Sequence, residues 1–236
     1  MGVRLPGANG RDVIEAEGVR RHFGTVVALD GLSLHVPAGC TFGLIGPNGA
    51  GKTTFIRMVV GLDRPQAGHV LVFGRRLPDP AVAPSIGYMP QSESLYLDLA
   101  ARENLAFFGS IYGLRATLLR TRIADVLELV GLDRAADRVV ETMSGGMRRR
   151  LSLAVALLHQ LALLVLDEPT SALDVSVQAQ IINLLQRLQS ERKLTYLFIT
   201  HDLSVIQHIS DRIAVMYLSK MVKLDTTEHI FAGDAQ

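Results

Sequence analysis

The chain has 236 residues, of which 48% are apolar and 20% are charged, so it has enough apolar material for a core and is not a disordered chain. Its 24 Lys and Arg residues nearly balance its 23 Asp and Glu residues, for a net charge of +1. Without a strong overall field to attract nucleic acid, we expect no nucleic-acid partner. The single cysteine, Cys40, cannot form an internal disulfide, which is typical of a reducing cytosol.

Hydropathy gives no candidate for a membrane-spanning helix. The most apolar uncharged stretch covers residues 151–166 and is interrupted by Ser152, His159 and Gln160, whereas a spanning helix needs about 20 largely apolar residues. We interpret this stretch as a buried helix followed by a buried strand. Residues 1–12 lack the apolar stretch of a secretion signal and are expected to form a loose leader. If the protein works at a membrane, another chain must supply the membrane part.

The first quarter of the chain is rich in residues typical of strands and turns. Its predicted strands cover residues 13–16, 26–28, 32–36 and 41–45. The last of these is a compact apolar run that stops at a glycine. After a glycine-rich loop, residues 53–60 have a helical pattern closed by Gly61. Two further strands are predicted at residues 69–73 and 86–89.

Helical patterns dominate from about residue 98 to residue 158. Two helices, over residues 101–112 and 118–130, carry apolar residues at mixed spacings of three and four. Strands and helices then alternate, with strands predicted at residues 161–166, 195–200 and 213–217 and helices at residues 175–192 and 203–209. This alternation predicts one α/β core with a mainly parallel sheet, interrupted by a helical insert.

The glycine-rich loop matches the pattern G-x-x-x-x-G-K-[ST] between a predicted strand and a predicted helix. Its residues are Gly46, Pro47, Asn48, Gly49, Ala50, Gly51, Lys52 and Thr53. Glycines let successive backbone N–H groups surround phosphate oxygens, helped by the positive end of the following helix. Lys52 would bridge the β- and γ-phosphates of a nucleotide, and the Thr53 hydroxyl would hold Mg²⁺. The flanking strand and helix disfavour the alternative, an ordinary glycine turn.

Two carboxylates follow the apolar run at residues 163–166. A buried parallel strand that ends in Asp delivers a carboxylate to the edge of the sheet where ligands bind, so Asp167 would reach the magnesium through water. Glu168 would polarise a water that attacks the γ-phosphate. Alone, this segment is more simply a strand followed by a polar turn. Together with the phosphate loop, it predicts a nucleotide hydrolase.

Three further features lie at a helix start or at strand ends. The segment Ser144-Gly145-Gly146-Met147 opens a helix, and its amides would form a second anion site, although a simple helix-starting turn is the alternative. His201 follows a predicted strand and would hydrogen-bond a γ-phosphate, whereas a lone histidine is more often structural or merely exposed. Gln91 follows the strand at 86–89, where its amide would coordinate Mg²⁺ or water and sense movement of the helical insert.

Three consecutive arginines, Arg148, Arg149 and Arg150, invite a nucleic-acid interpretation. At the start of a helix, however, such a run is more often a solvated or interface face. We therefore expect these side chains to lie on a surface.

These motifs, in this order, resemble those of the ATP-binding cassette (ABC) ATPase family over about residues 13–232. The resemblance implies an α/β fold, namely a P-loop NTPase (RecA-like) core with an N-terminal antiparallel β part and an inserted α-helical subdomain. Residues 1–236 would form a single ABC ATPase domain. Its core would comprise about residues 13–90 and 160–236, and its helical subdomain about residues 91–159.

The resemblance also assigns roles to individual residues, with ATP and Mg²⁺ as the ligands. The implied catalytic residues are Glu168, His201, Lys52 and Gln91. The implied nucleotide-binding residues are Phe23, Gly46, Pro47, Asn48, Gly49, Ala50, Gly51, Lys52, Thr53, Thr54, Ser144, Gly145, Gly146 and Asp174. The implied Mg²⁺ ligands are Thr53, Gln91 and Asp167. The sequence lacks the N-K-x-D motif that reads guanine, which favours ATP.

The chain departs from the family pattern in two places. The signature reads Met143-Ser144-Gly145-Gly146-Met147 where many members have Leu-Ser-Gly-Gly-Gln, and Phe23 replaces the commoner Tyr as the aromatic that stacks on adenine. Because the Ser-Gly-Gly core and an aromatic ring face are both kept, we expect phosphate binding and stacking to survive.

The resemblance implies partners as well. Two cassettes would pair head to tail around two ATP molecules, either as a homodimer or with a second ABC ATPase. The pair would drive an integral membrane permease from the cytoplasmic side of the cell membrane, as a peripheral subunit.

The two parts of the chain resemble different transporters. Residues 28–31, 86–91 and 102–105, in the N-terminal two-thirds, are similar to multidrug-export ATPases. Residues 171–181 and 194–205, in the C-terminal third, are similar to oligopeptide- and dipeptide-import ATPases. Because the helical insert and the surroundings of Gln91 contact the permease, we expect export of drugs or other small molecules, with peptide import as the alternative. A soluble ABC ATPase without a transport role is the second alternative, although such relatives typically carry two cassettes or large insertions.

Overall fold

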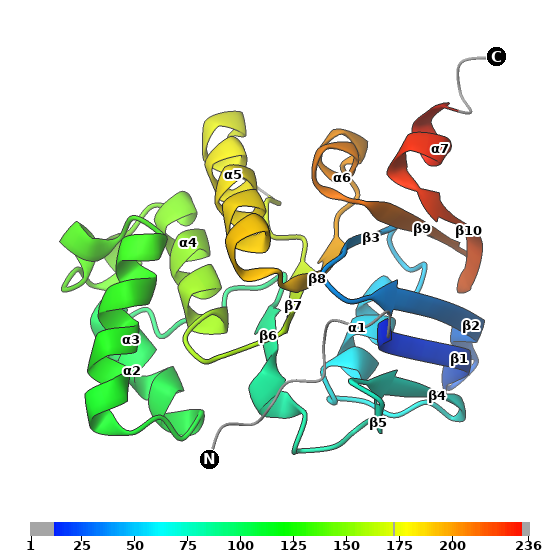
Figure 1. Ribbon diagram of the computed structural model, residues 1–236, viewed down its shortest axis with the longest axis horizontal. Helices are drawn as coiled ribbons and strands as arrows, with labels where there is room; N and C mark the ends of the chain where they lie inside the picture. Colours follow the sequence, from blue (N-terminus) through cyan, green and yellow to red (C-terminus); the bar gives the residue numbers. More distant parts are fainter. Residues whose placement is uncertain (1–11, 172, 233–236) are drawn as a thin grey trace.

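The computed structural model describes residues 12–171 and 173–232, and Figure 1 shows how its elements are arranged. The strands are β1 (Asp12–Phe23), β2 (Val26–Pro37), β3 (Thr41–Ile45), β4 (Ala67–Val72), β5 (Arg75–Arg76), β6 (Ile86–Met89), β7 (Leu163–Asp167), β8 (Thr195–Ile199), β9 (Arg212–Tyr217) and β10 (Lys220–Thr226). The helices are α1 (Lys52–Val59), α2 (Ala101–Ile111), α3 (Ala116–Leu129), α4 (Gly145–Ala156), α5 (Val175–Arg192), α6 (Leu203–Ile209) and α7 (Thr227–Ala232). Residues 1–11 of the expected leader lie outside the described residues, and Asp12 already begins β1.

The described strands form two sheets. One has the order β10-β9-β3-β8-β7-β6 and is parallel from β9 to β6, with β10 antiparallel at one edge. The other is antiparallel, with the order β2-β1-β4-β5. A helical segment is inserted between β6 and β7. This architecture confirms the predicted fold class, an α/β core with an N-terminal antiparallel part and a helical insert.

The central strands β3, β7 and β8 are buried along their whole length. Helices cover one face of the parallel sheet, and α1 with the antiparallel sheet covers the other, which explains their near-continuous apolar sequences. Alternate residues of β7 enter different cores: Leu164 joins the core with α4 and α5, whereas Val165 joins the core with α1. Each fully buried side chain of this kind contributes about 1.5–3 kcal/mol.

Residues 26–37 form one strand, β2, where the sequence predicts two strands, at residues 26–28 and 32–36. In the pairing with β1, Val19 faces Leu32 and Arg20 faces Asp30, so that Gly31 is skipped. Gly31 has a φ of 73°, a left-handed conformation that glycine adopts without steric cost. The strand therefore continues through a bulge rather than ending there. β10 and α7, which follow β9, were not predicted.

The helical insert lies to one side of the parallel sheet (Figure 1, green helices). α2, α3 and α4 pack on one another, and α4 also packs on β6. Their apolar faces belong to the same core as those of α5 and α6. No helix among residues 12–171 and 173–232 combines the length and apolar character needed to cross a membrane.

The parallel strands all end at one edge of the sheet, and the segments singled out by the sequence follow those ends. β3 leads into the glycine-rich loop, β6 into Gln91, β7 into Glu168 and β8 into Thr200 and His201. Ligands of open α/β sheets bind outside the carboxyl ends of the strands. The topology thus gathers these segments into one candidate site.

Candidate functional site

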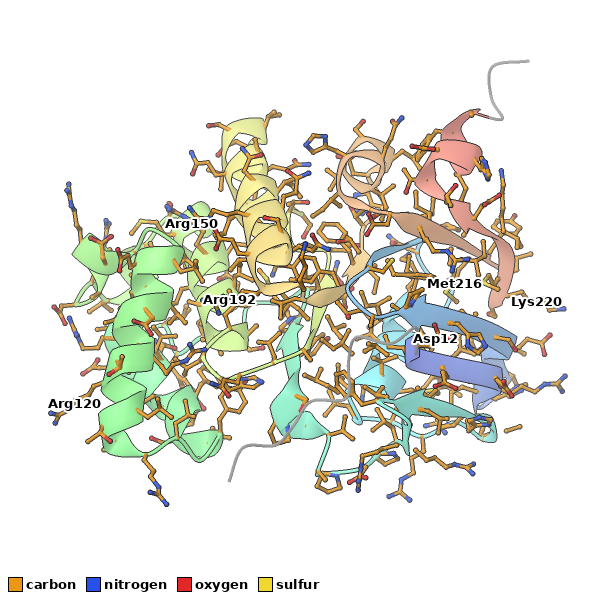
Figure 2. The ribbon with its side chains drawn as sticks, in the orientation of Figure 1. Asp12, Arg120, Arg150, Arg192, Met216 and Lys220 are labelled. Atoms are coloured by element: carbon orange, nitrogen blue, oxygen red, sulfur yellow. The ribbon has the colours of Figure 1, made fainter. Side chains whose placement is uncertain are left out.

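The glycine-rich loop connects β3 to α1 at this edge. Gly46, Gly49 and Gly51 have φ values of 152°, 80° and 100°, a backbone region that other residues rarely adopt. A Cβ atom on Gly46 would collide with the carbonyl of Met216 (labelled in Figure 2), and one on Gly51 with the carbonyl of Ala28. Glycine is therefore required at these two positions because the loop packs directly against β9 and β2.

Lys52 is the first residue of α1, and its ammonium group folds back onto the loop. Nζ donates to the carbonyl oxygens of Gly46 at 2.7 Å and Pro47 at 2.9 Å. Lys52 is only 6% exposed, and this burial lowers its pKa, while the charges of Glu168 and Asp167 oppose the shift. A positive charge held against a glycine-rich loop that leads into a helix start is suited to binding phosphate oxygens.

Asp167 ends β7 and is buried. Burial, and then the negative charge of Glu168, raises the pKa of Asp167 to about 6, although the charges of Lys52 and Arg149 oppose the rise. A nearby metal cation would favour the ionised form. The Asp167 carboxylate, the Thr53 hydroxyl and the Gln91 amide supply oxygen ligands of the kind that Mg²⁺ prefers, and all three residues line one pocket. The residues expected to hold Mg²⁺ therefore fit that ion.

Glu168 is held between two neighbouring strand ends. Its Oε2 atom accepts a hydrogen bond from Gln91 Nε2 at 3.0 Å, and its Oε1 atom lies 3.3 Å from His201 Nδ1. Its backbone N–H donates to the carbonyl of Ile199 at 2.9 Å, and its φ is 49°. A left-handed conformation at a residue other than glycine costs about 1–3 kcal/mol and persists where the surroundings impose it. The carboxylate is thus fixed in direction by Gln91 and His201.

A pocket of about 460 Å³ collects most of the predicted site residues. The predicted residues that line it are Phe23, Asn48, Gly49, Gly51, Lys52, Thr53, Thr54, Gln91, Asp167 and Glu168. Val26, Val27 and Ala28 of β2 also line it and were missed, because nothing in their apolar sequence distinguishes them from core residues. Gly46, Pro47 and Ala50 belong to the same loop without lining the pocket.

An aromatic ring also lines the pocket, that of Phe23. Phe23 ends β1 and is 49% exposed. The guanidinium of Arg21 lies 4.7 Å from the centre of its ring, which is a cation–π contact. The exposed ring can present a face to a flat heterocycle.

Four predicted nucleotide-binding residues that lie outside the loop do not line this pocket either. Ser144 caps α4, with its Oγ atom accepting from the N–H of Met147 at 3.3 Å, and Asp174 caps α5 by accepting from the N–H of Val177 at 3.0 Å. A Cβ atom on Gly146 would lie 2.7 Å from Val177, so the starts of α4 and α5 are in contact. Gly145 faces open space. Ala172, in the same turn as Asp174, lies outside the described residues.

The expectation of an arginine-lined surface is wrong for Arg149. Arg149 is 4% exposed, and its guanidinium is hydrogen-bonded to backbone carbonyls. The helical period contained a signal for this burial, because Arg149 lies three residues after Gly146 and four before Leu153, and both of these are buried. Arg150, labelled in Figure 2, instead donates to the carbonyl of Val130 at 3.2 Å.

Comparisons with known proteins agree with this architecture. A family model described as ABC transporter matches residues 29–171. The chain is 38% identical over 213 residues to the Nod factor export ATP-binding protein I of Ralstonia nicotianae, covering 89% of this chain and 66% of that protein. It is 37% identical over 216 residues to the linearmycin resistance ATP-binding protein LnrL of Bacillus subtilis, covering 91% and 69%. It is 38% identical over 231 residues to the methionine import ATP-binding protein MetN of Rhodopseudomonas palustris, covering 93% and 62%. The chain spans about two thirds of the length of these relatives.

Solved structures share the fold. CbiO1 from Clostridium perfringens, part of the ABC transporter complex cbiONQ, superposes with a TM-score of 0.87 at 23% identity, covering 95% of this chain and 92% of that one. The ATP-binding cassette MJ0796, as a dimer bound to ADP and Pi, superposes with a TM-score of 0.81 at 25% identity, covering 91% and 98%.

Proposed function

This chain belongs to the ABC transporter family, whose ATP-binding subunits hydrolyse ATP, and from that premise we propose that it is the ATP-hydrolysing subunit that drives a separate membrane permease. The observation that carries the proposal is the position of Glu168. Its carboxylate contacts Gln91 and His201 and lines the same pocket as Lys52 and Asp167. This pocket therefore combines a base, a fixed cation and a metal ligand around one site.

In this proposal, the loop over residues 46–54 and the ammonium of Lys52 bind the triphosphate of ATP. Thr53, Gln91 and Asp167 would hold Mg²⁺, which when bound neutralises part of the phosphate charge. Phe23 offers a ring face to the adenine. The apolar side chains of Val26 and Val27 border the pocket beside it.

Hydrolysis requires a water molecule in line with the bond that breaks. Glu168 orients this water and accepts its proton, while the bond between the γ-phosphorus and the bridging oxygen breaks to give ADP and inorganic phosphate. Gln91 and His201 hold the carboxylate toward the pocket by their contacts with its two oxygens. In the same proposal, His201 hydrogen-bonds the γ-phosphate.

Replacement of His201 by alanine is expected to lower the rate of hydrolysis by about 100-fold, with little change in ATP affinity. The side chain is 63% exposed and contacts Glu168, whereas the loop that would bind phosphate does not depend on it. The measurement compares kcat with the Kd for a fluorescent ATP analogue. The exposed His229, which contacts Asp225 in the same way, provides the matched control His229→Ala. Equal losses of binding and turnover in His201→Ala would assign His201 a structural role.

We propose that two copies, or this chain and a second ABC ATPase, pair head to tail around two ATP molecules. The support is that Ser144, Gly145, Gly146 and Asp174 lie at the starts of α4 and α5, outside the pocket of their own chain. In a head-to-tail pair these residues would complete the pocket of the other copy. ATP would then favour the closed pair, and hydrolysis would remove that attraction.

We propose a domain division and a docking face on the same basis. Residues 1–236 form one ABC ATPase domain, with a core at about 13–90 and 160–236 and a helical subdomain at about 91–159. An apolar groove of about 220 Å³ lies where the segment before Gln91 meets that subdomain, lined by Tyr88, Pro90, Ser94, Leu95, Phe108, Tyr112, Ser152 and Val155. In this proposal a cytoplasmic segment of the permease binds there, and this chain would lie at the cytoplasmic side of the cell membrane as a peripheral subunit.

We propose export of drugs or other small molecules as the direction of transport. Relatives named for export and for import match at similar identity. The proposal therefore rests on two export-like segments: residues 86–91, which contribute Tyr88 and Pro90 to the docking groove, and residues 102–105, in the helix that contributes Phe108. Import of peptides is the second candidate, favoured by the import-like segments at residues 171–181 and 194–205. Purification of the tagged chain with its membrane partner distinguishes them: an efflux-type integral protein supports export, and a permease accompanied by a binding protein supports import.

A further inference from the structure

Arg149 connects three segments of the site through hydrogen bonds to their backbone. It lies in the second turn of α4, just after Ser144–Gly146, and is almost fully buried. Its Nε atom donates to the carbonyl of Pro169 at 2.9 Å. Its Nη1 atom donates to the carbonyls of Pro90 at 2.9 Å and Gln91 at 3.1 Å. Its Nη2 atom donates to the carbonyls of Asp167 at 3.0 Å and Glu168 at 2.6 Å.

All five N–H donors of the guanidinium are therefore used, and all five acceptors are backbone carbonyls. Burying a charge in this way is costly, and burial lowers the pKa of Arg149 even though the charges of Glu93, Asp167 and Glu168 oppose the shift. An apolar side chain could fill the same volume, but it would leave five carbonyls at two strand ends without this donor. The planar fork of arginine satisfies them together and so sets their relative positions.

The carbonyls bound by Arg149 belong to the backbone that carries Gln91 and Glu168. These two side chains contact each other at 3.0 Å across the pocket. The guanidinium therefore fixes the backbone of both residues whose side chains form this hydrogen bond. One of them, Glu168, has a left-handed conformation at this point. Any shift of α4 would be transmitted through one rigid group to the loop after β6 and the turn after β7.

We propose that Arg149 is a positioning residue that couples the start of α4 to the catalytic carboxylate of Glu168. This inference rests on the proposed function, in which Ser144–Gly146 contact the nucleotide bound mainly by the other copy. Contact at that nucleotide fixes α4, and Arg149 then aligns Glu168 for hydrolysis of the nucleotide in its own copy. Arg149 itself does not touch substrate.

The kinetic test uses Arg149→Lys and Arg149→Gln. A lysine ammonium has three donors and a glutamine amide has two, so neither can serve all five carbonyls. We expect kcat to fall by about 100-fold, the effect of a displacement on the order of 1 Å, with the Kd for ATP within about twofold of native. The matched control is Arg122→Lys. Like Arg149, Arg122 donates only to backbone carbonyls, but these are the three of Leu157, Leu158 and His159 at the far end of α4. The three donors of lysine match the three carbonyls at this position, so the control should keep kcat.

Hydrogen exchange tests the coupling separately from the rate. In the native chain, a non-hydrolysable ATP analogue should slow exchange in peptides covering residues 143–148 and 89–93. In Arg149→Lys the first peptide should still gain protection and the second should not, whereas in Arg122→Lys both should gain it. A merely structural arginine would not separate the two peptides.

Each other outcome has a definite meaning. An unchanged kcat, equal losses of kcat in Arg149→Lys and Arg122→Lys, or protection of both peptides in Arg149→Lys would overturn the coupling. Failure of both Arg149 variants to fold would assign the residue to the core and overturn it equally. The native chain is assayed alongside: absence of ATP hydrolysis by the native chain would instead overturn the proposed function.

Discussion

Replacement of Glu168 by glutamine is expected to lower ATP turnover by about 10³-fold, equivalent to about 4 kcal/mol of activation free energy. Glutamine keeps the shape of the side chain and can still accept a hydrogen bond from Gln91 Nε2, so the arrangement around it is retained. An amide oxygen, however, cannot take up the proton of the attacking water. ATP affinity should stay within about twofold of native, because Lys52 and the loop are unchanged.

The same variant should accumulate as an ATP-bound dimer. If nucleotide stabilises the closed pair and hydrolysis opens it, a chain that binds but does not hydrolyse remains closed. Single-turnover hydrolysis and light scattering with saturating Mg²⁺ and ATP measure the two effects. Glu93→Gln is the matched control, since Glu93 is a nearby carboxylate that pairs with Arg148 at 2.9 Å and does not line the pocket. Native turnover in Glu168→Gln would remove Glu168 from its role, and a monomer would contradict the paired arrangement.

The phosphate loop and the carboxylate strand could be predicted from the sequence because the constraints on them are local. The glycines of the loop are required by backbone conformation and by close packing on β2 and β9. The apolar run before Asp167 reflects a strand buried on both faces. The parallel topology then brings the ends of β3, β6, β7 and β8 to one edge, so segments far apart in the chain could be assigned to one site before their contacts were known.

The parts that could not be predicted depend on contacts between distant segments. Arginine is usually an exposed residue type, and although Arg149 has the helical spacing of a buried position, the five carbonyls that pair with its charge come from distant segments of the chain. β10 is largely exposed, so its sequence lacks the regular apolar alternation that marks a strand. The continuity of β2 through Gly31 likewise depends on its pairing with β1. This pairing continues on both sides of a bulge that the local sequence does not predict.

The position of Ser144–Gly146 has a different physical origin. In one chain these residues lie at the start of α4, against the start of α5, and line no part of the pocket that holds Lys52. Their sequence predicts an anion site whether they line the pocket of their own chain or lie outside it, because a helix start presents free amides wherever it lies. Only the three-dimensional arrangement shows that Ser144–Gly146 lie outside the pocket that contains Lys52. That separation is what makes a second cassette necessary in the proposed function.

Replacement of Lys52 by alanine is expected to weaken ATP binding by at least about 100-fold. Nζ is the one side-chain cation lining the pocket within the described residues, and charge-assisted hydrogen bonds to phosphate contribute about 1.5–3 kcal/mol each. The fold should survive, because the carbonyls of Gly46 and Pro47 that Nζ now satisfies lie at an open loop that water can reach. Isothermal titration with ATP, ADP and adenosine measures the effect. The loss should be largest for ATP and absent for adenosine, which has no phosphate and in the proposed function would stack on Phe23.

Lys220→Ala is the matched control for this loss of a positive charge. Lys220, labelled in Figure 2, pairs with Asp30 at 3.2 Å, is 62% exposed and does not line the pocket. Removing an exposed pair of this kind changes stability by less than about 1 kcal/mol, so its ATP affinity should equal that of the native chain. If Lys52→Ala bound ATP as tightly as Lys220→Ala, or lost affinity for adenosine as much as for ATP, the loop around Lys52 would not be the phosphate site. The assignment of Glu168 as the base acting on a γ-phosphate would then fail with it, because both depend on the same position of the nucleotide.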